Sequence, residues 1–115
     1  MVRINWTFQA KDDLKDQAED ISKDSNRYAK LQITRLKIRT RVLKTQSHSG
    51  KIVPEINRED IRELIEGNYI IVYKIVEDNQ IDILTTHHSA RDLTRYLLSD
   101  FEMKIAFFLD LKYLL

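Results

Sequence analysis

The sequence predicts an α+β domain in which one strand and two helices precede an antiparallel meander of three strands. Apolar and polar residues alternate over residues 2–7, which is the period of a half-buried strand. Apolar residues then recur every three or four positions between residues 8 and 44, as they do in amphipathic helices. Three strand-like runs follow at residues 61–65, 69–76 and 80–86, and the turns between them are short enough to require antiparallel pairing.

The size and composition of the chain limit the classes of protein to which it can belong. With 115 residues, of which 43% are hydrophobic and 32% charged, the chain has the length of one domain and the composition of a compact fold. We expect this domain to cover residues 1–98 and an apolar carboxyl-terminal extension to cover residues 99–115. The net charge of +1 provides no general attraction to nucleic acid or membranes. Residues 35–51, however, include six basic residues and no acidic one, which suits an acidic partner.

Some kinds of site and location are excluded by what the sequence lacks. There is no cysteine, and the three histidines have no metal-ligand spacing, so we expect neither a metal nor a cofactor. The first residues form no signal peptide, and no run of about 18 apolar residues is present to cross a membrane. We therefore expect a cytoplasmic protein.

Both helices have a residue suited to cap them. Thr7 is placed to cap the first helix and Ser25 the second. The second helix leaves two interpretations open, because residues 36–42 also alternate like a strand. Residues 29–44 contain neither glycine nor proline and are rich in helix-forming residues, which favours helix. The first helix has a narrow apolar stripe, made of Ala10, Leu14, Ala18 and Ile21.

The carboxyl-terminal part of the chain is the most apolar. Residues 90–98 are expected to form a third, short helix, in which Leu93, Tyr96 and Leu97 can pack. Residues 101–115 are too apolar to stand alone in water, since exposed patches of that kind mark interfaces. They either pack on the sheet of their own chain or join another chain.

Two pairs of adjacent polar residues fall within or at the end of strands. Arg62 and Glu63 are consecutive in a strand, so their side chains point to opposite faces of the sheet. Either could form a surface ion pair, or Arg62 could contact phosphate together with Arg91. His87 and His88 are likewise directed to opposite faces, and the common role of such a histidine is in a core or a cap.

Residues 50–92 place a turn, three strand-like runs and a histidine–arginine corner in close succession. They begin with Gly50-Lys51-Ile52-Val53-Pro54-Glu55 and end with His87-His88-Ser89-Ala90-Arg91-Asp92. This order resembles the RelE/ParE family of toxins from bacterial toxin–antitoxin pairs, and the resemblance extends over roughly residues 2–95. It implies a toxin of a type II pair, in which helices cover one face of a sheet and a cognate antitoxin neutralises the toxin.

The RelE-like branch of this family implies one set of catalytic candidates. RelE-like toxins are ribosome-dependent messenger-RNA endonucleases that need no metal, and they use cations to stabilise the charged phosphorane. Arg91 matches their corner arginine, Tyr96 is one residue before their helical tyrosine, and Arg62 lies on a central strand. The arginine that they carry after the strand tyrosine is Ile70 in this chain, which departs from the nuclease pattern.

The ParE-like branch is the favoured one. Its members keep the fold without that catalytic set and poison DNA gyrase through protein contacts, and residues 53–55 and 61–64 are closer to this branch. The alternatives are the ribosome-dependent nuclease and an inactive module that forms homodimers through its apolar tail. Antitoxins of such pairs wrap the toxin with helices and an added strand, which predicts an apolar groove along the helices or an open sheet edge. Candidate contacts to target or antitoxin are Arg35, Arg39, Glu63, Tyr69, His87 and His88.

Overall fold

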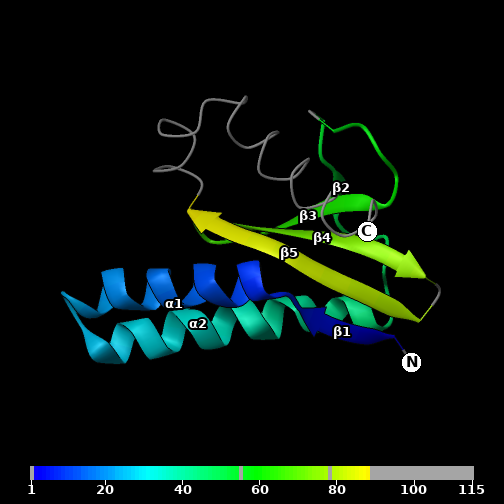
Figure 1. Cartoon of the computed structure of the whole chain (residues 1–115). Coiled ribbons are helices and arrows are strands. Elements are labelled where there is room, and N and C mark those ends of the chain that lie inside the picture. Colours follow the sequence, from blue (N-terminus) through cyan, green and yellow to red (C-terminus); the bar gives the residue numbers. More distant parts are fainter. Residues whose placement is uncertain (1, 55, 78, 89–115) are drawn as a thin grey trace.

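A hairpin of two helices packs on one face of a five-stranded sheet (Figure 1). The structure is a computed structural model, and it describes residues 2–54, 56–77 and 79–88. The α+β class predicted from the sequence is confirmed. The third helix and the apolar tail expected over residues 90–115 lie outside the described residues. The elements in chain order are β1 (Arg3–Trp6), α1 (Phe8–Ser22), α2 (Asn26–Arg39), the 3₁₀ helix η1 (Thr40–Lys44), β2 (Lys51–Ile52), β3 (Ile61–Glu66), β4 (Tyr69–Glu77) and β5 (Gln80–His88).

The sheet combines an antiparallel meander with one parallel strand pair. Its strand order is β1-β5-β4-β3-β2, and β3, β4 and β5 form the antiparallel meander that the sequence predicts. The two-residue β2 pairs with β3 at one edge. β1 lies at the other edge and runs parallel to β5, with Ile4 opposite Ile81 and Trp6 opposite Ile83. The first strand of the chain is therefore held by the last strand that the structure describes.

Both helices begin at the expected caps. The Thr7 hydroxyl accepts a hydrogen bond from the Ala10 amide at 3.2 Å, and the Ser25 hydroxyl accepts one from the Tyr28 amide at 3.1 Å. α2 ends at Arg39 and continues directly into η1, so residues 36–42 are helical and not extended. The helix interpretation of this stretch is confirmed.

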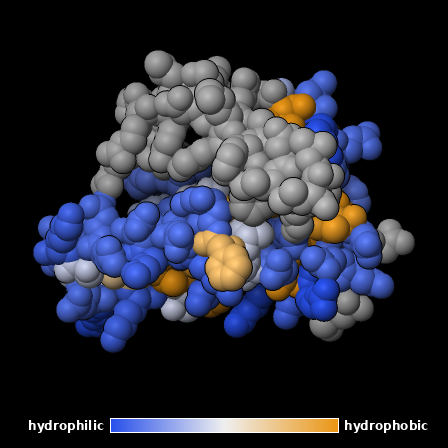
Figure 2. Space-filling model, viewed as in Figure 1, coloured by the Kyte–Doolittle hydropathy of each residue, from blue (hydrophilic) through white to orange (hydrophobic). Residues whose placement is uncertain are grey.

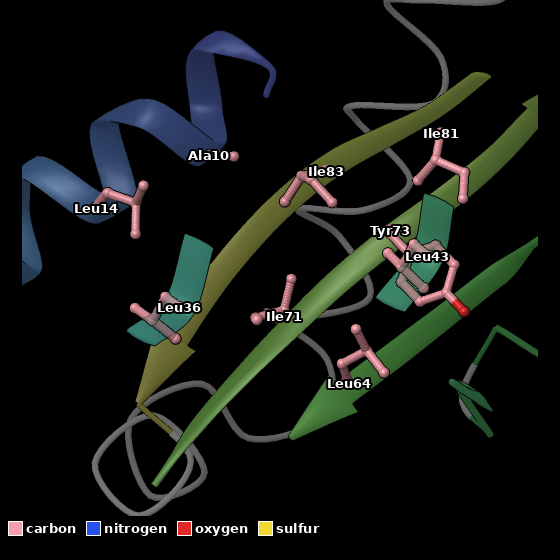
Figure 3. Packing of buried hydrophobic residues seen from close by; sticks show 9 residues of the cluster. All are labelled: Ala10, Leu14, Leu36, Leu43, Leu64, Ile71, Tyr73, Ile81 and Ile83. Carbon is pink, nitrogen blue, oxygen red and sulfur yellow. The ribbon is translucent and has the colours of Figure 1, made fainter. Parts of the chain in front are cut away.

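The main core lies between the helical hairpin and the sheet (Figure 3). α1 and α2 contribute small and branched aliphatic side chains, and the strands contribute mainly isoleucine. Burial of these side chains removes apolar surface from water and so holds the helical hairpin on the sheet. The buried members of this core are Ala10, Leu14, Leu36, Leu43, Leu64, Ile71, Tyr73, Ile81 and Ile83.

Polar contacts fix α1 on β5 beside that core. Asp13 is 9% exposed, and its carboxylate accepts hydrogen bonds from the Thr85 hydroxyl and from the Thr86 amide at 3.1 Å. One turn further on, the Gln17 side-chain amide donates to the Thr86 carbonyl at 3.0 Å. These contacts satisfy buried polar groups, and they set the position of α1 along the strand.

The face of the sheet turned away from α1 and α2 has a smaller core and a row of polar residues; we call it the helix-free face, because none of the described helices covers it. Val53 and Ile56, from the segment after β2, pack with buried apolar residues of three strands, namely Ile61, Val72 and Leu84. Beside them, Asp82 accepts hydrogen bonds from Asn5 and Gln80, and the Lys74 ammonium lies 3.7 Å from the Asp60 carboxylate. Burial lowers the pKa of Lys74, and the negative charge of Asp60 partly offsets this effect.

Candidate partner-binding site

A hollow with an apolar floor lies between α1 and α2. Its volume is about 510 Å³, and Trp6, Leu14, Ala18 and Ile33 supply its apolar lining. Ala18 follows Leu14 by one helical turn, and its small side chain leaves space that a longer one would fill. The remaining lining residues are all lysines, namely Lys11, Lys15 and Lys37.

A second hollow continues from the first along the outer side of β1. It has a volume of about 480 Å³ and lies between β1 on one side and α2 and η1 on the other. Trp6 and Lys37 line both hollows, so the two adjoin each other. We call the two hollows together the basic groove, since their charged lining residues are basic throughout: Arg3, Lys11, Lys15, Lys37, Arg41 and Lys44.

The backbone of β1 faces this groove with its outer edge. The Arg3 amide donates to Asn79 at 2.8 Å and the Thr7 amide donates to Ile83 at 3.2 Å, both on the inner side. Alternate residues of a strand direct their amides to opposite sides, so those of Ile4 and Trp6 point outward. Such an edge can accept one more strand from another chain. The expected open sheet edge and apolar groove thus occur together.

The sequence carried only partial signals for this groove. Lys11 and Lys15 are one turn apart on α1, which marks a basic side of that helix. That Trp6 and Lys37 meet is a consequence of tertiary packing between segments about 30 residues apart, which no local pattern records. In Figure 2 the helical hairpin is mainly hydrophilic, with small and separate hydrophobic areas among the charged side chains.

Arg62, a catalytic candidate, is engaged with the backbone. Its guanidinium donates to the carbonyl oxygens of Glu59 at 2.9 Å and Gly50 at 3.0 Å, and more weakly to that of His48 at 3.4 Å. These contacts tie the segment before β2 to β3. The other two catalytic candidates, Arg91 and Tyr96, lie outside the described residues, so the predicted catalytic set stays a prediction.

The two arginines proposed as contacts on α2 differ in environment. The Arg39 Nε donates to the Ile65 carbonyl at 3.1 Å and lies 4.0 Å from the Glu66 carboxylate, so this side chain covers the edge of β3 beyond β2. Arg35 is exposed on the outer side of α2. Only Arg35 is therefore directed to solvent in a way that suits a partner.

The remaining candidate contacts lie near the open end of β4 and β5. The rings of Tyr69 and His88 meet edge to face, with centroids 5.0 Å apart and an interplanar angle of 86°. His87 is opposite Ile70, which packs on the helix-free face, whereas Tyr69 packs against the main core. Glu63 is paired with Val72 on the helix-free face. These residues do not converge with Arg35 or with the basic groove.

Tyr73 is a buried polar anchor that the sequence reading missed. Its hydroxyl accepts a hydrogen bond from the Gly50 amide at 3.0 Å and donates one to the Ser47 carbonyl at 2.8 Å. Burial raises the pKa of Tyr73, and the nearby Gly50 amide opposes this shift. The sequence signal for this anchor was a tyrosine within an apolar strand. The hydroxyl of a buried tyrosine usually has a hydrogen-bond partner.

Neither a metal site nor a membrane span is found in the part of the chain that the structure describes. There, no three histidine, aspartate or glutamate residues gather as metal ligands would. None of the helices over residues 2–88 that are described is long and apolar enough to cross a membrane.

The fold and the groove define a small α+β protein with a basic groove beside an edge strand. A family model described as the ParE toxin of the type II toxin–antitoxin system parDE matches residues 4–93, and the chain belongs to this family. A solved structure described as the chromosomal ParDE system from P. aeruginosa has the same fold, with a TM-score of 0.62 and 18% sequence identity over 76% of this chain and 96% of that one. No curated protein sequence matches the chain significantly. The resemblance stated from the sequence, with its preference for the ParE-like branch, is confirmed.

Proposed function

We propose that this toxin stops bacterial growth by binding a target such as DNA gyrase, and that a cognate antitoxin neutralises it by occupying the basic groove. Membership of the ParE family supports the toxin role. The observation that supports the antitoxin site is the basic groove, whose two adjoining hollows lie along the helices and beside β1, an edge strand of the described sheet.

The two parts of the groove suit two kinds of secondary structure. An extended segment of the antitoxin can pair with the outward amides of Ile4 and Trp6 along β1. An amphipathic helix can then place apolar side chains, spaced three and four residues apart, over Leu14, Ala18 and Ile33. Trp6 lines both parts and so contacts both segments.

The charge of the groove specifies the chemistry of its partner. Six basic side chains line it, and none of its lining residues among those described is acidic. We therefore expect the antitoxin segment to carry aspartate and glutamate on either side of its apolar residues. Complementary charge of this kind accelerates association and favours the correct partner.

The engagement of Arg62 favours a binding toxin over the nuclease alternative. Its guanidinium donates to three backbone carbonyl groups, and a phosphate ligand would have to displace those bonds. Ile70 also stands where RelE-like nucleases carry an arginine. Inhibition of a target through protein contacts is therefore the better supported mechanism.

Binding measurements with the product of the adjacent small gene test the antitoxin site. Lys37→Glu reverses a charge that lines both parts of the groove, and we expect it to weaken the complex by about tenfold or more in calorimetric titration. Lys30→Glu is the matched control, because Lys30 is exposed on α2 but does not line the groove. Equal affinities of the two variants would contradict this site.

The mechanism is tested by inducing the chain in bacteria with and without the adjacent gene. We expect growth arrest with loss of DNA supercoiling activity and relief of both by the antitoxin. Rapid cleavage of translated mRNA, abolished by Arg91→Ala, would instead support the nuclease. Unimpaired growth would leave the inactive module as the remaining hypothesis.

A further inference from the structure

The outer side of α2 exposes a stripe of large apolar residues. Tyr28 is 51% exposed, Leu31 44% and Ile38 49%, and exposed Arg35 lies among them. Successive members are three, four and three residues apart, so they follow one side of the helix. We call these four residues the α2 stripe.

The α2 stripe is separate from the basic groove. Ile33 and Lys37 are the residues of α2 that line the hollow between the helices. At 100° per residue, the centre of the α2 stripe lies about 160° around the helix axis from these two residues. Ala29, Gln32 and Leu36 are the buried residues of α2 and face the sheet. The exposure of the stripe is therefore not explained by the groove or by the core.

The composition of the α2 stripe is that of a protein-binding surface. Single exposed apolar residues are common and need no explanation. Here three exposed apolar residues lie along one side of the helix. The stripe also includes a tyrosine and an arginine, two residue types that often dominate the affinity of protein interfaces. Exposed Leu31 and Ile38 would not be buried by a sugar–phosphate backbone, which favours a protein over a nucleic acid.

The basic residues around the α2 stripe indicate which kind of protein partner could bind it. α2 has five basic residues, including Arg27 and Arg35, and no acidic one, and residues 25–54 contain no aspartate or glutamate. A second copy of this chain could not pair its own stripe here, because arginines would face arginines. The complementary surface has carboxylates around an apolar patch.

We propose that the α2 stripe binds the cellular target through which the chain inhibits growth, and that this target presents an acidic surface with an apolar centre. The proposal rests on the proposed function as a growth-inhibiting toxin. The stripe lies on the other side of α2 from the groove, so the contacts of this target are separate from those of an antitoxin in the groove.

The test separates the α2 stripe from the groove by using variants of the full chain. Leu31→Ser with Ile38→Ser removes two apolar anchors, and we expect inhibition of growth to require about tenfold more toxin, or more, at equal protein level. Affinity for the adjacent gene product, measured by calorimetry, should be unchanged. Ile65→Ser is the matched control, because this isoleucine is 50% exposed and lies on β3, and it should remain as toxic as the unaltered chain.

A second pair of variants distinguishes a protein from a nucleic acid. Leu31→Asp with Ile38→Asp should abolish toxicity in either case, whereas Leu31→Ser with Ile38→Ser should weaken it only if apolar contact is needed. Toxic serine variants would overturn the proposal, and so would serine variants that also lose the antitoxin complex. An unaltered chain that does not slow growth would overturn the proposed function together with this inference, whereas normal toxicity of the serine variants would overturn the inference alone.

Discussion

The Tyr73 hydroxyl connects the middle of the sheet to the loop that precedes β2. Two backbone groups of that loop depend on it, the Gly50 amide and the Ser47 carbonyl. Neither group has another hydrogen-bond partner within the described interactions, and a buried amide without a partner is costly. A single oxygen atom thus positions a loop of irregular structure.

Removal of this oxygen should be measurable. Tyr73→Phe should lower the free energy of unfolding by about 1–3 kcal/mol in urea denaturation, because it leaves the buried Gly50 amide and the partly buried Ser47 carbonyl without this partner. Tyr28→Phe is the control, since Tyr28 is 51% exposed and should change the unfolding free energy little. Equal stability of the two variants would show that water replaces the hydroxyl.

The contribution of Tyr73 to the free energy of unfolding should also depend on pH in the alkaline range. Because the folded-state pKa of Tyr73 is raised above 10.0, the neutral phenol is favoured more in the folded than in the unfolded state. The contribution of Tyr73 to stability is therefore complete below pH 10 and is lost as pH rises through the folded-state pKa. The difference in free energy of unfolding between the unaltered chain and Tyr73→Phe should shrink above that pH. Lys74 titrates in both proteins, so its effect cancels in this comparison.

The two glycines of the described chain are needed for different reasons. A methyl group on Gly50 would lie 2.6 Å from the Glu63 carbonyl oxygen and 2.7 Å from the Tyr73 hydroxyl, so there is no space for it. Gly67 has open space but a φ of +59°, a conformation that other residues adopt at a cost. Gly50→Ala should destabilise the fold by about 1–3 kcal/mol and Gly67→Ala by about 1 kcal/mol, as measured by thermal unfolding. The reverse order would contradict the close packing at Gly50.

At the scale of elements, the helix starts and the antiparallel meander were predicted, because local sequence signals determine them. Thr7 and Ser25 start the helices where they were expected, because a cap acts on amides within three residues. The meander was predictable because its turns are short. The parallel pairing of β1 with β5 joins residues 77 positions apart, as in the bond from Asn5 to Asp82, and no local pattern encodes it. The residues that line the groove could not be predicted for the same reason, since β1 is one of its walls.

The attachment of α1 to the sheet should depend on Asp13. Its carboxylate accepts bonds from the Thr85 hydroxyl and the Thr86 amide, and loss of a charged buried acceptor leaves both donors unpaired. Asp13→Ala should therefore cost about 2–3 kcal/mol of unfolding free energy. Asp12→Ala, at an exposed neighbouring position, should cost little. Hydrogen exchange should locate the loss of protection in α1 and β5, and uniform loss would indicate a different cause.

At the scale of the whole molecule, a net charge near zero conceals two helices of opposite charge. α1 carries five acidic residues against two lysines, whereas α2 carries five basic residues and no acidic one. Composition alone suggested no preference for a partner, but the fold gathers Lys37 of α2, Arg41 and Lys44 of η1, Lys11 and Lys15 of α1 and Arg3 of β1 around one groove. The regional excess of basic residues in the sequence was the part of this arrangement that could be anticipated.

This charge separation predicts the salt dependence of antitoxin binding. Raising the ionic strength from 0.05 to about 0.5 M shortens the range of electrostatic attraction, so the association rate with the antitoxin should fall about tenfold or more in stopped-flow measurements. The dissociation rate should change less, because it depends on the apolar contacts in the groove. A salt-independent association rate would exclude an acidic partner at the groove.

The parallel pairing of β1 with β5 also bears on how the toxin is made. Residues 3–6 leave the ribosome early, but β5, their partner among the described strands, is complete only after His88 has been added. Until then β1 has no neighbour to hold it, and the groove between β1 and η1 has one wall missing. Under the proposed function, an unfinished chain offers its antitoxin no complete groove, and recognition waits until nearly the whole described domain has been synthesised.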